Sequence, residues 1–518
     1  MTKTQVGPDI PRLQSLDPSS GKVLGEVQAN TPDEVREAVE HARKAAPEWG
    51  ALSVKQRGAS LKEVRHRIFE NLDRIVETIS SENGKPRAEA LSHDVLPALI
   101  TIQYLEGLAA KALKTEHVGR FIGPVMGTSS RIEFRPFGVV GAITPWNYPF
   151  FLAFMAITPA LVAGNAVVLK PSEATPGVGE RLKEILDPLP PGVCTVVQGA
   201  GEVGAALVDA PVDKICFIGS PGTGRRIAEA AAKHLTPVVM ELGGQDAAIV
   251  CEDAHLDTAA SGVLWGAFLN CGQTCAAIER VYVPETIADA FEAKLVEKLK
   301  QVPAEDFGPL TVPRQLDIVK RHVADAVQHG AKVLAGGPAD TNGEGLHHPP
   351  TIVEGRSEEM AIFKEETFGP LLPVIRVRDE DEAVERANRE GFNLTSSVWT
   401  SNKRRGDRIA ARLRAGTVSI NDHAIAAAAP WAVWGGVGES GYGRLNGELG
   451  IREFTVPVHV TRNTLPKMKR LFWYPYDRPT TEAFRGLAGV YSAPTWRGKL
   501  KALGTVARTA GKAIRHKL

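Results

Sequence analysis

The chain has 518 residues, of which 43% are hydrophobic and 23% are charged. This length predicts about two to four domains, and the composition excludes an intrinsically disordered chain. The net charge of +1, from 61 Lys and Arg residues against 60 Asp and Glu residues, argues against a nucleic-acid partner. Five cysteines are too few for a disulfide scaffold, and an odd number leaves a free thiol, as is typical of a reducing compartment.

The first part of the chain shows helical patterning. The N-terminal residues lack the apolar stretch of a secretory signal, so we expect a cytoplasmic protein. Thr31 and Pro32 open a predicted helix, and helical spacing continues over residues 31–115. The uncharged stretch between Arg135 and Lys170 is as long as a membrane span, but four prolines interrupt it. We therefore expect it to form buried protein interior.

Short apolar runs separated by helix-length segments fill the middle of the chain. They occupy residues 139–143, 166–169, 195–197 and 214–218, and then 280–283, 331–334 and 372–375. Strands that alternate with helices predict parallel sheets with helical crossovers. The pattern therefore indicates an α/β fold with two lobes.

The last segment is basic and partly aromatic. From Arg462 onward, Lys and Arg greatly outnumber acids, and residues 471–476 hold clustered aromatics. One predicted helical face carries apolar residues, namely Leu500, Leu503, Ala507, Ala510, Ile514 and Leu518, while Lys499, Arg508, Lys512 and Arg515 lie off it. A solvated or subunit-docked terminal helix is the ordinary interpretation of such a charge run. The alternative is a peripheral helix on an anionic membrane surface.

Cys275 is a candidate nucleophile, because it ends a polar, glycine-containing segment, Asn270-Cys-Gly-Gln-Thr-Cys275. A thiolate attacks carbonyl carbon well but needs a neighbouring base, cation or helix N-terminus. Taken alone, an inert buried cysteine is the commoner interpretation. Cys271 and Cys275 do not have a common zinc spacing, so we expect no metal site.

Two further polar residues stand at the ends of predicted strands or turns. Glu241 follows the strand-like residues 238–240 and precedes two glycines, which suits a general base toward water; a capping or ion-paired carboxylate is the alternative. Asn147 lies between two prolines, and its amide suits donation to an oxyanion; an asparagine that satisfies a turn is the alternative.

Two segments suit a phosphate-containing ligand. Residues 217–224 read as a strand, a glycine-rich turn and the start of a helix, whose backbone amides bind phosphate oxygens. The segment lacks a Walker lysine and does not match the Gly-x-Gly-x-x-Gly pattern. Lys170 and Glu173 follow the 166–169 strand, at the edge where ligands of open α/β sheets bind.

Seven motifs follow one another in order. They are Pro145-Trp-Asn-Tyr-Pro149, residues 159–173, Phe217-Ile-Gly-Ser220, Glu241-Leu-Gly-Gly244, Gly272-Gln-Thr-Cys275, Glu366-Thr-Phe-Gly-Pro370 and residues 435–441. Together they resemble the aldehyde dehydrogenase superfamily, over a stretch from Leu16 to Thr464.

The resemblance implies a domain plan. A Rossmann-like NAD-binding domain would comprise residues 1–118 and 137–243, and an α/β catalytic domain residues 244–436. Residues 119–136 and 437–465 would form a small β arm that joins subunits into a homodimer or tetramer. The basic C-terminal tail, 466–518, lies outside the resemblance.

The resemblance also implies site roles. Cys275 would be the nucleophile, Glu241 the base, and the Asn147 amide with the Cys275 backbone N–H the oxyanion hole. The residues implied for cofactor binding are Trp146, Lys170, Glu173, Gly219, Ser220, Gly224, Gly243, Glu366 and Phe368. A carboxylate at position 173 would bind a free 2′-hydroxyl and repel a 2′-phosphate, so we expect NAD, with NADP as the alternative.

The implied substrate tunnel holds Tyr148, Phe151, Leu152 and Met155, and residues 150–156 carry no charge. We therefore expect an apolar aliphatic or aromatic aldehyde, oxidised to its carboxylic acid, and residues 435–441 with Tyr474 and Tyr476 also resemble the fatty and aromatic aldehyde branch. A succinate-semialdehyde-type dehydrogenase would instead need a buried cation for the distal carboxylate. The motifs are also compatible with a CoA-acylating dehydrogenase, and with a membrane-surface binding protein that has the same fold.

Overall fold

The computed structural model describes residues 11–119, 127–337, 345–355, 359–389, 391–423 and 425–517. The N-terminal residues 1–10, on which the expectation of no signal segment rests, lie outside the described residues. The chain divides into two units. The larger unit runs to Lys114 and from Phe134 to Val456, and the smaller unit comprises 115–133 and residues from Pro457 onward.

The larger unit begins with a hairpin and a set of helices, which confirm the helical prediction for residues 31–115. The hairpin is β1 (Arg12–Leu16) and β2 (Val23–Gln28), and the helices are α1 (Pro32–Ala51), α2 (Val54–Glu70), α3 (Leu72–Asn83), α4 (Arg87–Glu89), the π-helical η1 (Ala90–Val95) and α5 (Leu96–Ala112). Thr31 and Glu34 form a capping box at the start of α1, because each side chain accepts the other's backbone N–H.

A six-stranded sheet forms the core of the first lobe. Its order is β19-β9-β8-β5-β6-β7, from β5 (Val139–Ile143), β6 (Ala166–Lys170), β7 (Cys194–Val196), β8 (Lys214–Ile218), β9 (Val238–Glu241) and β19 (Gly441–Tyr442). Five strands run parallel, and β19 pairs antiparallel with β9. The strands β5, β6, β7 and β8 match the predicted apolar runs.

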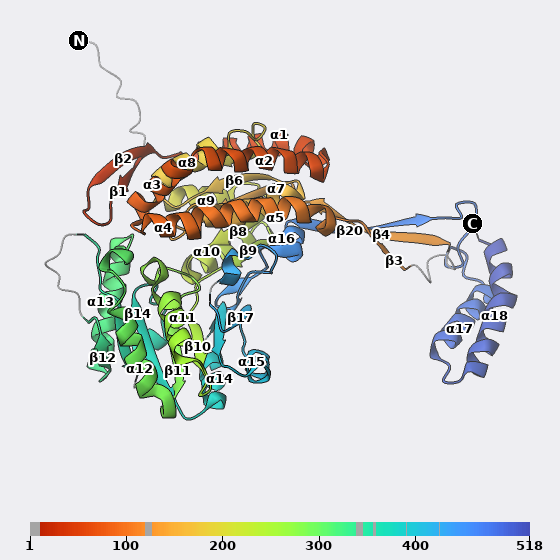
Figure 1. Cartoon of the computed structure of the whole chain (residues 1–518). Helices are drawn as coiled ribbons and strands as arrows, with labels where there is room; N and C mark the ends of the chain where they lie inside the picture. Colours follow the sequence, from red (N-terminus) through yellow and green to blue (C-terminus); the bar gives the residue numbers. More distant parts are fainter. Residues whose placement is uncertain are drawn as a thin grey trace, which may run out of the picture. The chain divides into compact units, whose positions relative to one another are not determined.

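Helices cover both faces of this sheet (Figure 1). They are α7 (Phe151–Ala163), α8 (Pro176–Leu186), α9 (Gly201–Asp209) and α10 (Pro221–Ala232). Successive residues of β5 point to opposite faces, so Val140 joins the core under α7 and α5, whereas Val139 joins the core under α1, α9 and α10. The result is the doubly wound α/β architecture that the sequence predicts.

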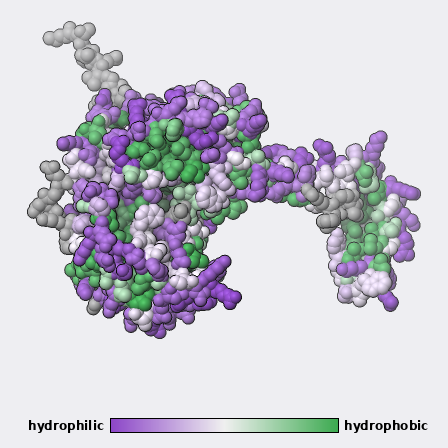
Figure 2. Space-filling model, viewed as in Figure 1, coloured by the Kyte–Doolittle hydropathy of each residue, from purple (hydrophilic) through white to green (hydrophobic). Residues whose placement is uncertain are grey.

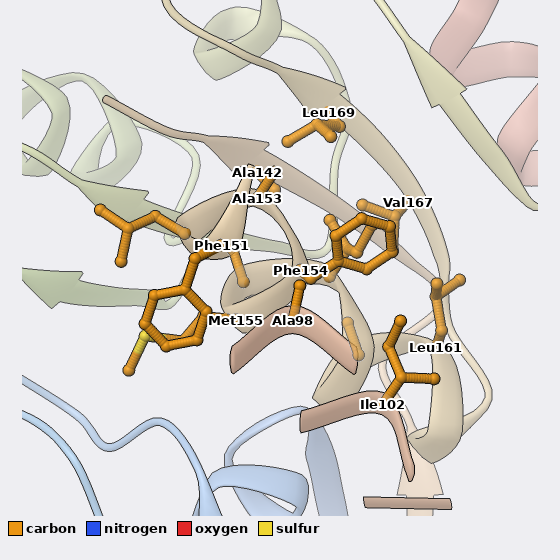
Figure 3. Close-up of a cluster of buried hydrophobic side chains, with 14 of the residues drawn as sticks. Ala98, Ile102, Ala142, Phe151, Ala153, Phe154, Met155, Leu161, Val167 and Leu169 are labelled. Carbon is orange, nitrogen blue, oxygen red and sulfur yellow. The ribbon is translucent and has the colours of Figure 1, made fainter. Parts of the chain in front are cut away.

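The membrane-length apolar stretch is protein interior, as predicted. Every residue of α7 is buried, and its helix ends at Gly164, which has a φ of +102°. Figure 3 shows Phe151, Phe154 and Leu161 of α7 packed with Val167 of β6 and with Ala98 and Ile102 of α5. Among the described residues, no helix is long and apolar enough to cross a membrane.

The second lobe is built on a seven-stranded sheet, ordered β12-β13-β14-β11-β10-β16-β17. The strands are β10 (Asp246–Val250), β11 (Ile278–Pro284), β12 (Lys332–Ala335), β13 (Thr351–Gly355), β14 (Leu371–Val377), β16 (Thr395–Trp399) and β17 (Thr417–Ile420). All neighbours run parallel except β12, which is antiparallel to β13.

Helices again lie on both faces of the second sheet. Those on one face are α11 (Leu256–Phe268) and α12 (Glu285–Leu299), and those on the other are α13 (Pro313–Gln328), α14 (Glu380–Arg389) and α15 (Lys403–Ala410). Shorter elements complete the unit, namely η2 (Leu269–Gly272), η3 (Ala304–Asp306), η4 (Ala361–Phe363), β15 (Phe392–Asn393), η5 (Ile425–Ala428), β18 (Val437–Gly438) and α16 (Gly447–Glu453).

The smaller unit contains a three-stranded sheet and two helices. The sheet is ordered β20-β4-β3, from β3 (Glu116–Val118), β4 (Thr128–Pro136) and β20 (Thr455–Asn463), and the helices are α17 (Arg478–Ser492) and α18 (Trp496–Arg515). The boundaries of the predicted domains stay predictions. The observed division differs from them in placing residues 437–456 in the larger unit and in joining the predicted tail to strands of the predicted arm.

The first sheet has a switch point that positions the site. From β5 the chain adds β6 and β7 on one side and then β8 and β9 on the other, so the connections diverge between β5 and β8. In open α/β sheets, ligands bind at the carboxyl ends of the strands that flank such a point. The segments that follow β5, β8 and β9 carry Asn147, Gly219 and Glu241.

Candidate active site

A cavity of about 410 Å³ lies at the switch point of the first sheet. Residues at the ends of β5, β8 and β9 line it together with the cysteine segment and a segment before β14. Its lining includes the predicted site residues Trp146, Asn147, Leu152, Gly219, Ser220, Glu241, Gly243, Cys275, Glu366 and Phe368. Residues from separate stretches of sequence therefore meet at one cavity.

The cysteine segment is a tight left-handed turn. Asn270, Cys271 and Gly272 have φ values of +52°, +54° and +75°, a conformation that costs energy for residues with a side chain. The Gln273 side chain fixes the turn: its Nε2 donates to the Asn270 carbonyl at 3.1 Å, and its Oε1 accepts the Thr311 N–H at 2.8 Å. The turn presents the half-buried Cys275 to the cavity.

The Cys275 thiol and the Glu241 carboxyl group line the same cavity and influence each other electrostatically. Burial raises the pKa of the Cys275 thiol well above its usual range, and the charge of Glu241 raises it further. Burial also raises the pKa of Glu241 to about 7, against the lowering effects of the nearby Cys275 and of Trp434, whose Nε1 donates to Oε1 at 3.2 Å. Near neutral pH, Glu241 is therefore poised to take a proton from a neighbouring thiol or water.

Asn147 is buried, and its side chain and peptide are held by several partners. Its Nδ2 donates to the Gln273 carbonyl at 3.0 Å, and a carboxamide nitrogen carries a second N–H. Its backbone carbonyl accepts hydrogen bonds from Asn270 Nδ2 at 2.9 Å and from Lys85 Nζ at 2.7 Å. The peptide of Asn147 is thus fixed, while the residue lines the cavity together with Cys275.

A buried ion pair supports this loop. Lys85 Nζ lies 2.7 Å from Asp94 Oδ2, and both side chains are fully buried. Asp94 Oδ1 also accepts the backbone N–H groups of Phe150 at 3.1 Å and Phe151 at 2.8 Å. The pair therefore connects η1 to the start of α7 and to the carbonyl of Asn147.

The two glycines after Glu241 occupy positions where no side chain fits. A Cβ on Gly243 would lie 2.2 Å from a carboxylate oxygen of Glu366, and a Cβ on Gly244 would lie 2.4 Å from the carbonyl oxygen of Cys275. Both distances are far below contact distance. Close approach of the base strand to the cysteine segment therefore requires glycine at position 244, whereas a side chain at position 243 would displace the Glu366 carboxylate.

A second pair of carboxylates shapes another wall of the cavity. Glu366 Oε1 accepts the Gly244 N–H at 2.9 Å, and burial, with the nearby Glu279, raises the pKa of Glu366 well above its ordinary value. Glu279 accepts the Phe368 N–H at 2.7 Å, and Phe368 has a φ of +50°. The Phe368 ring meets Trp146 edge-on, with ring centroids 5.6 Å apart.

The residues implied for the rest of a dinucleotide are spread beyond the cavity. Ser220 is the residue before α10, and both it and Gly219 line the cavity. Gly224 lies within α10, where a Cβ would come within 2.8 Å of Leu242. Lys170, at the end of β6, forms an ion pair of 2.6 Å with Glu173, and this pair is not part of the cavity lining.

The four implied tunnel residues are all buried, but they do not have equal access to the cavity. Leu152 lines it. The Tyr148 hydroxyl lies 2.7 Å from Thr274 Oγ1, next to the nucleophile, and Lys85 Nζ lies 3.9 Å from the centre of its ring. Phe151 and Met155 lie one helical turn apart in the same buried cluster (Figure 3).

The sequence does not indicate which side chains hold Glu241 and Asn147 in place. Trp434, which stands before two glycines in the sequence, donates to Glu241. Asn270 begins the cysteine motif, and its side chain holds the Asn147 carbonyl. Lys85, Asp94 and Glu279 carry no local signal, because their partners lie elsewhere in the chain. Among the described residues, no cluster of His, Cys, Asp and Glu is placed to hold a metal ion.

Comparisons with known proteins place the chain in a family. The model of the family described as "Aldehyde dehydrogenase family" matches residues 7–460. The 4,4'-diapolycopene aldehyde oxidase of Methylomonas sp is 38% identical over 484 residues, covering 92% of this chain and 90% of that protein. A putative succinate-semialdehyde dehydrogenase [NADP(+)] 2 of Mycobacterium ulcerans is 38% identical over 84% of this chain and 86% of its own length. The structure of a Mycobacterium tuberculosis aldehyde dehydrogenase complexed with NAD+ matches with a TM-score of 0.83 and 32% identity, covering 89% of this chain and 95% of that one.

Proposed function

Because the chain belongs to the aldehyde dehydrogenase family, and is therefore an oxidoreductase acting on the aldehyde group, we propose that it oxidises an apolar aldehyde to its carboxylic acid with NAD as the electron acceptor. One observation carries the proposal. The thiol of Cys275, the carboxyl group of Glu241 and the amide of Asn147 line a single cavity.

The first step is attack by sulfur. Glu241 takes the thiol proton, and the Cys275 thiolate adds to the aldehyde carbon to give a thiohemiacetal oxyanion. The second N–H of the Asn147 amide, with the backbone N–H of Cys275, donates to that oxygen. When the oxyanion reforms a C=O bond, the carbon loses its hydrogen with both electrons, and a thioester on Cys275 remains. A bound nicotinamide supplies the acceptor for that hydride.

The second step is hydrolysis. Glu241 removes a proton from water, which adds to the thioester carbon; the C–S bond then breaks and the acid leaves. The net change is one aldehyde and one water converted to one carboxylic acid, with a hydride passed to the acceptor and one proton released. A carboxyl group whose pKa is raised to about 7 suits this alternation between proton acceptor and donor. Activation of water would be superfluous if CoA were the thioester acceptor, so Glu241 disfavours the acylating reaction.

The cavity wall fits a dinucleotide. Gly219 and Ser220 place backbone groups and the start of α10 at the cavity, where a Cβ on Gly219 would come within 2.6 Å of the Phe217 ring. Trp146 and Phe368 form an aromatic corner, and the half-buried Glu366 suits hydrogen bonds to ribose hydroxyls. Lys170 and Glu173, at the end of β6, suit the adenosine ribose, and the carboxylate favours NAD over NADP. One structural neighbour is named as an NAD+ complex and one relative as NADP-dependent, so NADP is the alternative.

The substrate side supports an apolar aldehyde. Leu152 faces the cavity, and α7, which contains the implied tunnel residues Phe151 and Met155, has no charged side chain. One relative is named for a 4,4'-diapolycopene aldehyde, and others are named for succinate semialdehyde, which makes that compound the competing substrate. For assembly, we propose a homodimer or tetramer joined through the β3, β4 and β20 strands, as the family's arm implies.

A substrate panel tests the proposal. Purified protein is supplied with NAD or NADP and with aldehydes that vary in chain length, ring type and distal charge, and the formation of reduced cofactor is followed. We expect kcat/KM to rise with aliphatic length and to be low for succinate semialdehyde. Cys275→Ala should lose at least about 10³-fold in kcat. Persisting turnover in that variant would overturn the assigned nucleophile.

Single-turnover kinetics test the hydrolytic half. Glu241→Gln should retain an initial burst of up to one NADH per active site and lose steady-state turnover, because the thioester would form and persist. In the wild type, added CoA should leave the steady-state rate unchanged. A rate that rises with CoA concentration above the rate in water alone would instead favour the acylating reaction.

A further inference from the structure

The smaller unit ends in a helical hairpin, formed by α17 and α18, whose contact surface consists of small residues. A Cβ on Gly486 would lie 2.9 Å from Val506 Cγ2, and a Cβ on Gly489 would lie 2.8 Å from Ala502 Cβ. The later residue of α17 meets the earlier residue of α18, so the helices are antiparallel (Figure 1). Small residues at the contact let the two backbones approach closely and leave the large side chains outside it.

Polar contacts close the open end of the hairpin. Asp477 caps α17 by accepting the Thr480 N–H at 2.9 Å, and His516 Nδ1 lies 3.1 Å from the second oxygen of Asp477. The buried Lys517 Nζ donates to Thr480 Oγ1 at 2.7 Å. The end of α18 is thus fixed to the start of α17, and the hairpin presents two defined outer faces.

One outer face is apolar and exposed. Phe484 and Tyr491 of α17 are 40% and 74% exposed, and Trp496, Leu500 and Leu503 of α18 are 67%, 55% and 50% exposed. At about 100° per residue, the apolar stripe of α18 lies about a third of a turn from Ala502 and Val506, and that of α17 lies between a third and half of a turn from Gly486 and Gly489. Because the helices are antiparallel, both stripes fall on the same face of the hairpin. Figure 2 shows hydrophobic residues gathered along this hairpin beside hydrophilic ones.

The remaining surface of the hairpin is strongly basic. Its positively charged residues include Arg478, Arg485, Arg497, Lys501, Arg508, Lys512 and Arg515. The acid within the two helices is Glu482, which pairs with Arg478 at 3.0 Å. The whole chain has a net charge of +1, so the rest of the chain is acidic. The hairpin therefore concentrates positive charge beside an exposed apolar face.

We propose that the α17–α18 hairpin binds an anionic lipid bilayer, with the apolar face in the interfacial layer and the basic side chains on lipid headgroups. An amphipathic helix that carries Trp and Leu on one face and Lys and Arg on the other binds membranes in this way. Long basic side chains reach headgroups from the edges of such a face. Phe472 and Trp473, just before the hairpin, are 53% and 42% exposed and suit the same interface.

Charge favours lipid over a second copy of the hairpin. A symmetric contact between two hairpins would pair the same basic surface with itself, which costs electrostatic energy. An anionic bilayer instead attracts each basic residue near its surface. The family model ends at residue 460, so the hairpin lies outside the segment that the model matches. The inference is independent of the proposed substrate, since vesicle binding needs no turnover.

Vesicle co-sedimentation of the full-length protein tests the proposal. The vesicles are phosphatidylcholine alone or an equimolar mixture of phosphatidylcholine with phosphatidylglycerol. We expect binding to the mixed vesicles that falls at high salt and is at least about tenfold weaker on phosphatidylcholine alone. No binding to the mixed vesicles, or equal binding to both kinds, would overturn the proposal.

Paired variants locate the contact. Leu500→Glu with Leu503→Glu, on the apolar face, should weaken binding to mixed vesicles at least about tenfold, and Arg508→Gln with Lys512→Gln should weaken it by a similar factor. The matched control places two glutamates at exposed apolar positions of the larger unit, Leu235→Glu with Val327→Glu, and should leave binding within about twofold. Circular dichroism verifies that each variant is folded. A lower molar mass in light scattering with unchanged vesicle binding for the Leu500/Leu503 variant would show a subunit interface and overturn the proposal.

Discussion

Two buried carboxylates near the cavity illustrate opposite uses of burial. Asp94 has a lysine at 2.7 Å and two backbone N–H donors, so its charge is compensated. Glu241 instead accepts a hydrogen bond from an indole N–H and shares its cavity with a thiol, neither of them a cation, and burial raises its pKa to about 7. The positive charge of Lys85 lets Asp94 stay ionised and support the Asn147 loop. Glu241 has no such cation as a partner, so its carboxylate stays basic enough to accept protons.

The largest effect on stability is expected when the buried Asp94 loses its lysine partner. Lys85→Met leaves Asp94 buried without its cation, which should lower the free energy of unfolding by about 3–5 kcal/mol. The Asn147 carbonyl loses a donor in the same variant, so kcat should fall as well. Chemical denaturation and steady-state kinetics measure the two effects.

The double variant Lys85→Met with Asp94→Asn is the control for this comparison. Removal of both charges should recover most of the lost stability, because no uncompensated charge remains. If the single and double variants are equally unstable, the ion pair is not the cause of the loss.

The next effect concerns the pH dependence of stability. Glu241 has a folded-state pKa of about 7, above its ordinary value of 4.5. The protonated Glu241 therefore contributes fully to the free energy of unfolding below pH 4.5. This contribution is lost as the pH rises from 4.5 through 7, and the total loss is about 3 kcal/mol. Glu241→Gln cannot ionise, so it should gain stability relative to the wild type by most of that amount between about pH 5 and pH 8. Denaturation at both pH values measures the difference, and a constant difference would contradict the uncompensated state of Glu241.

The pH dependence of turnover offers a related test. The base must be ionised to accept a proton, so kcat/KM should fall as the pH drops below about 7. The rate of the NADH burst and the steady-state rate, each followed against pH, separate the two proton transfers that involve Glu241. An acid limb near the ordinary pKa of a glutamate would contradict the effect of burial.

The smallest expected effect comes from removing the one N–H that stabilises the ionised Glu241. Trp434→Phe removes the N–H that donates to Glu241 and that favours its ionised form. The acid limb of the pH profile should therefore move upward by about one unit, while the rate on the alkaline plateau stays close to that of the wild type. A shift toward lower pH would mean that the indole does not stabilise the carboxylate.

Some of the site is predictable from sequence for a clear physical reason. Cys275, Glu241 and Asn147 each belong to a short motif at a strand end or turn, and parallel strands bring such ends to one edge of a sheet. The same rule locates the strands β5, β6 and β8, whose buried residues form unbroken apolar runs. Local spacing thus suggests candidates, and the family resemblance of the ordered motifs assigns their roles.

The supporting contacts are not predictable, because they join residues far apart in sequence. Trp434 reaches Glu241 across 193 positions, and Asn270 reaches Asn147 across 123. No periodicity or motif indicates which side chains such loops bring together. The pairing of α17 with α18 is also not predictable from the sequence. The residues of α17 that contact α18 are small, so they give only a weak hydrophobic pattern.

The Gly243-Gly244 pair limits how this scaffold can be altered. A methyl group on Gly244 would collide with the backbone of Cys275, and one on Gly243 would displace the Glu366 carboxylate, so the loop between acid and sulfur is a poor place for substitutions. The α7 wall is different, because Leu152 reaches the cavity through a side chain that can be exchanged without moving the backbone. Engineering for new aldehydes should therefore begin in α7 and leave the loop after β9 untouched.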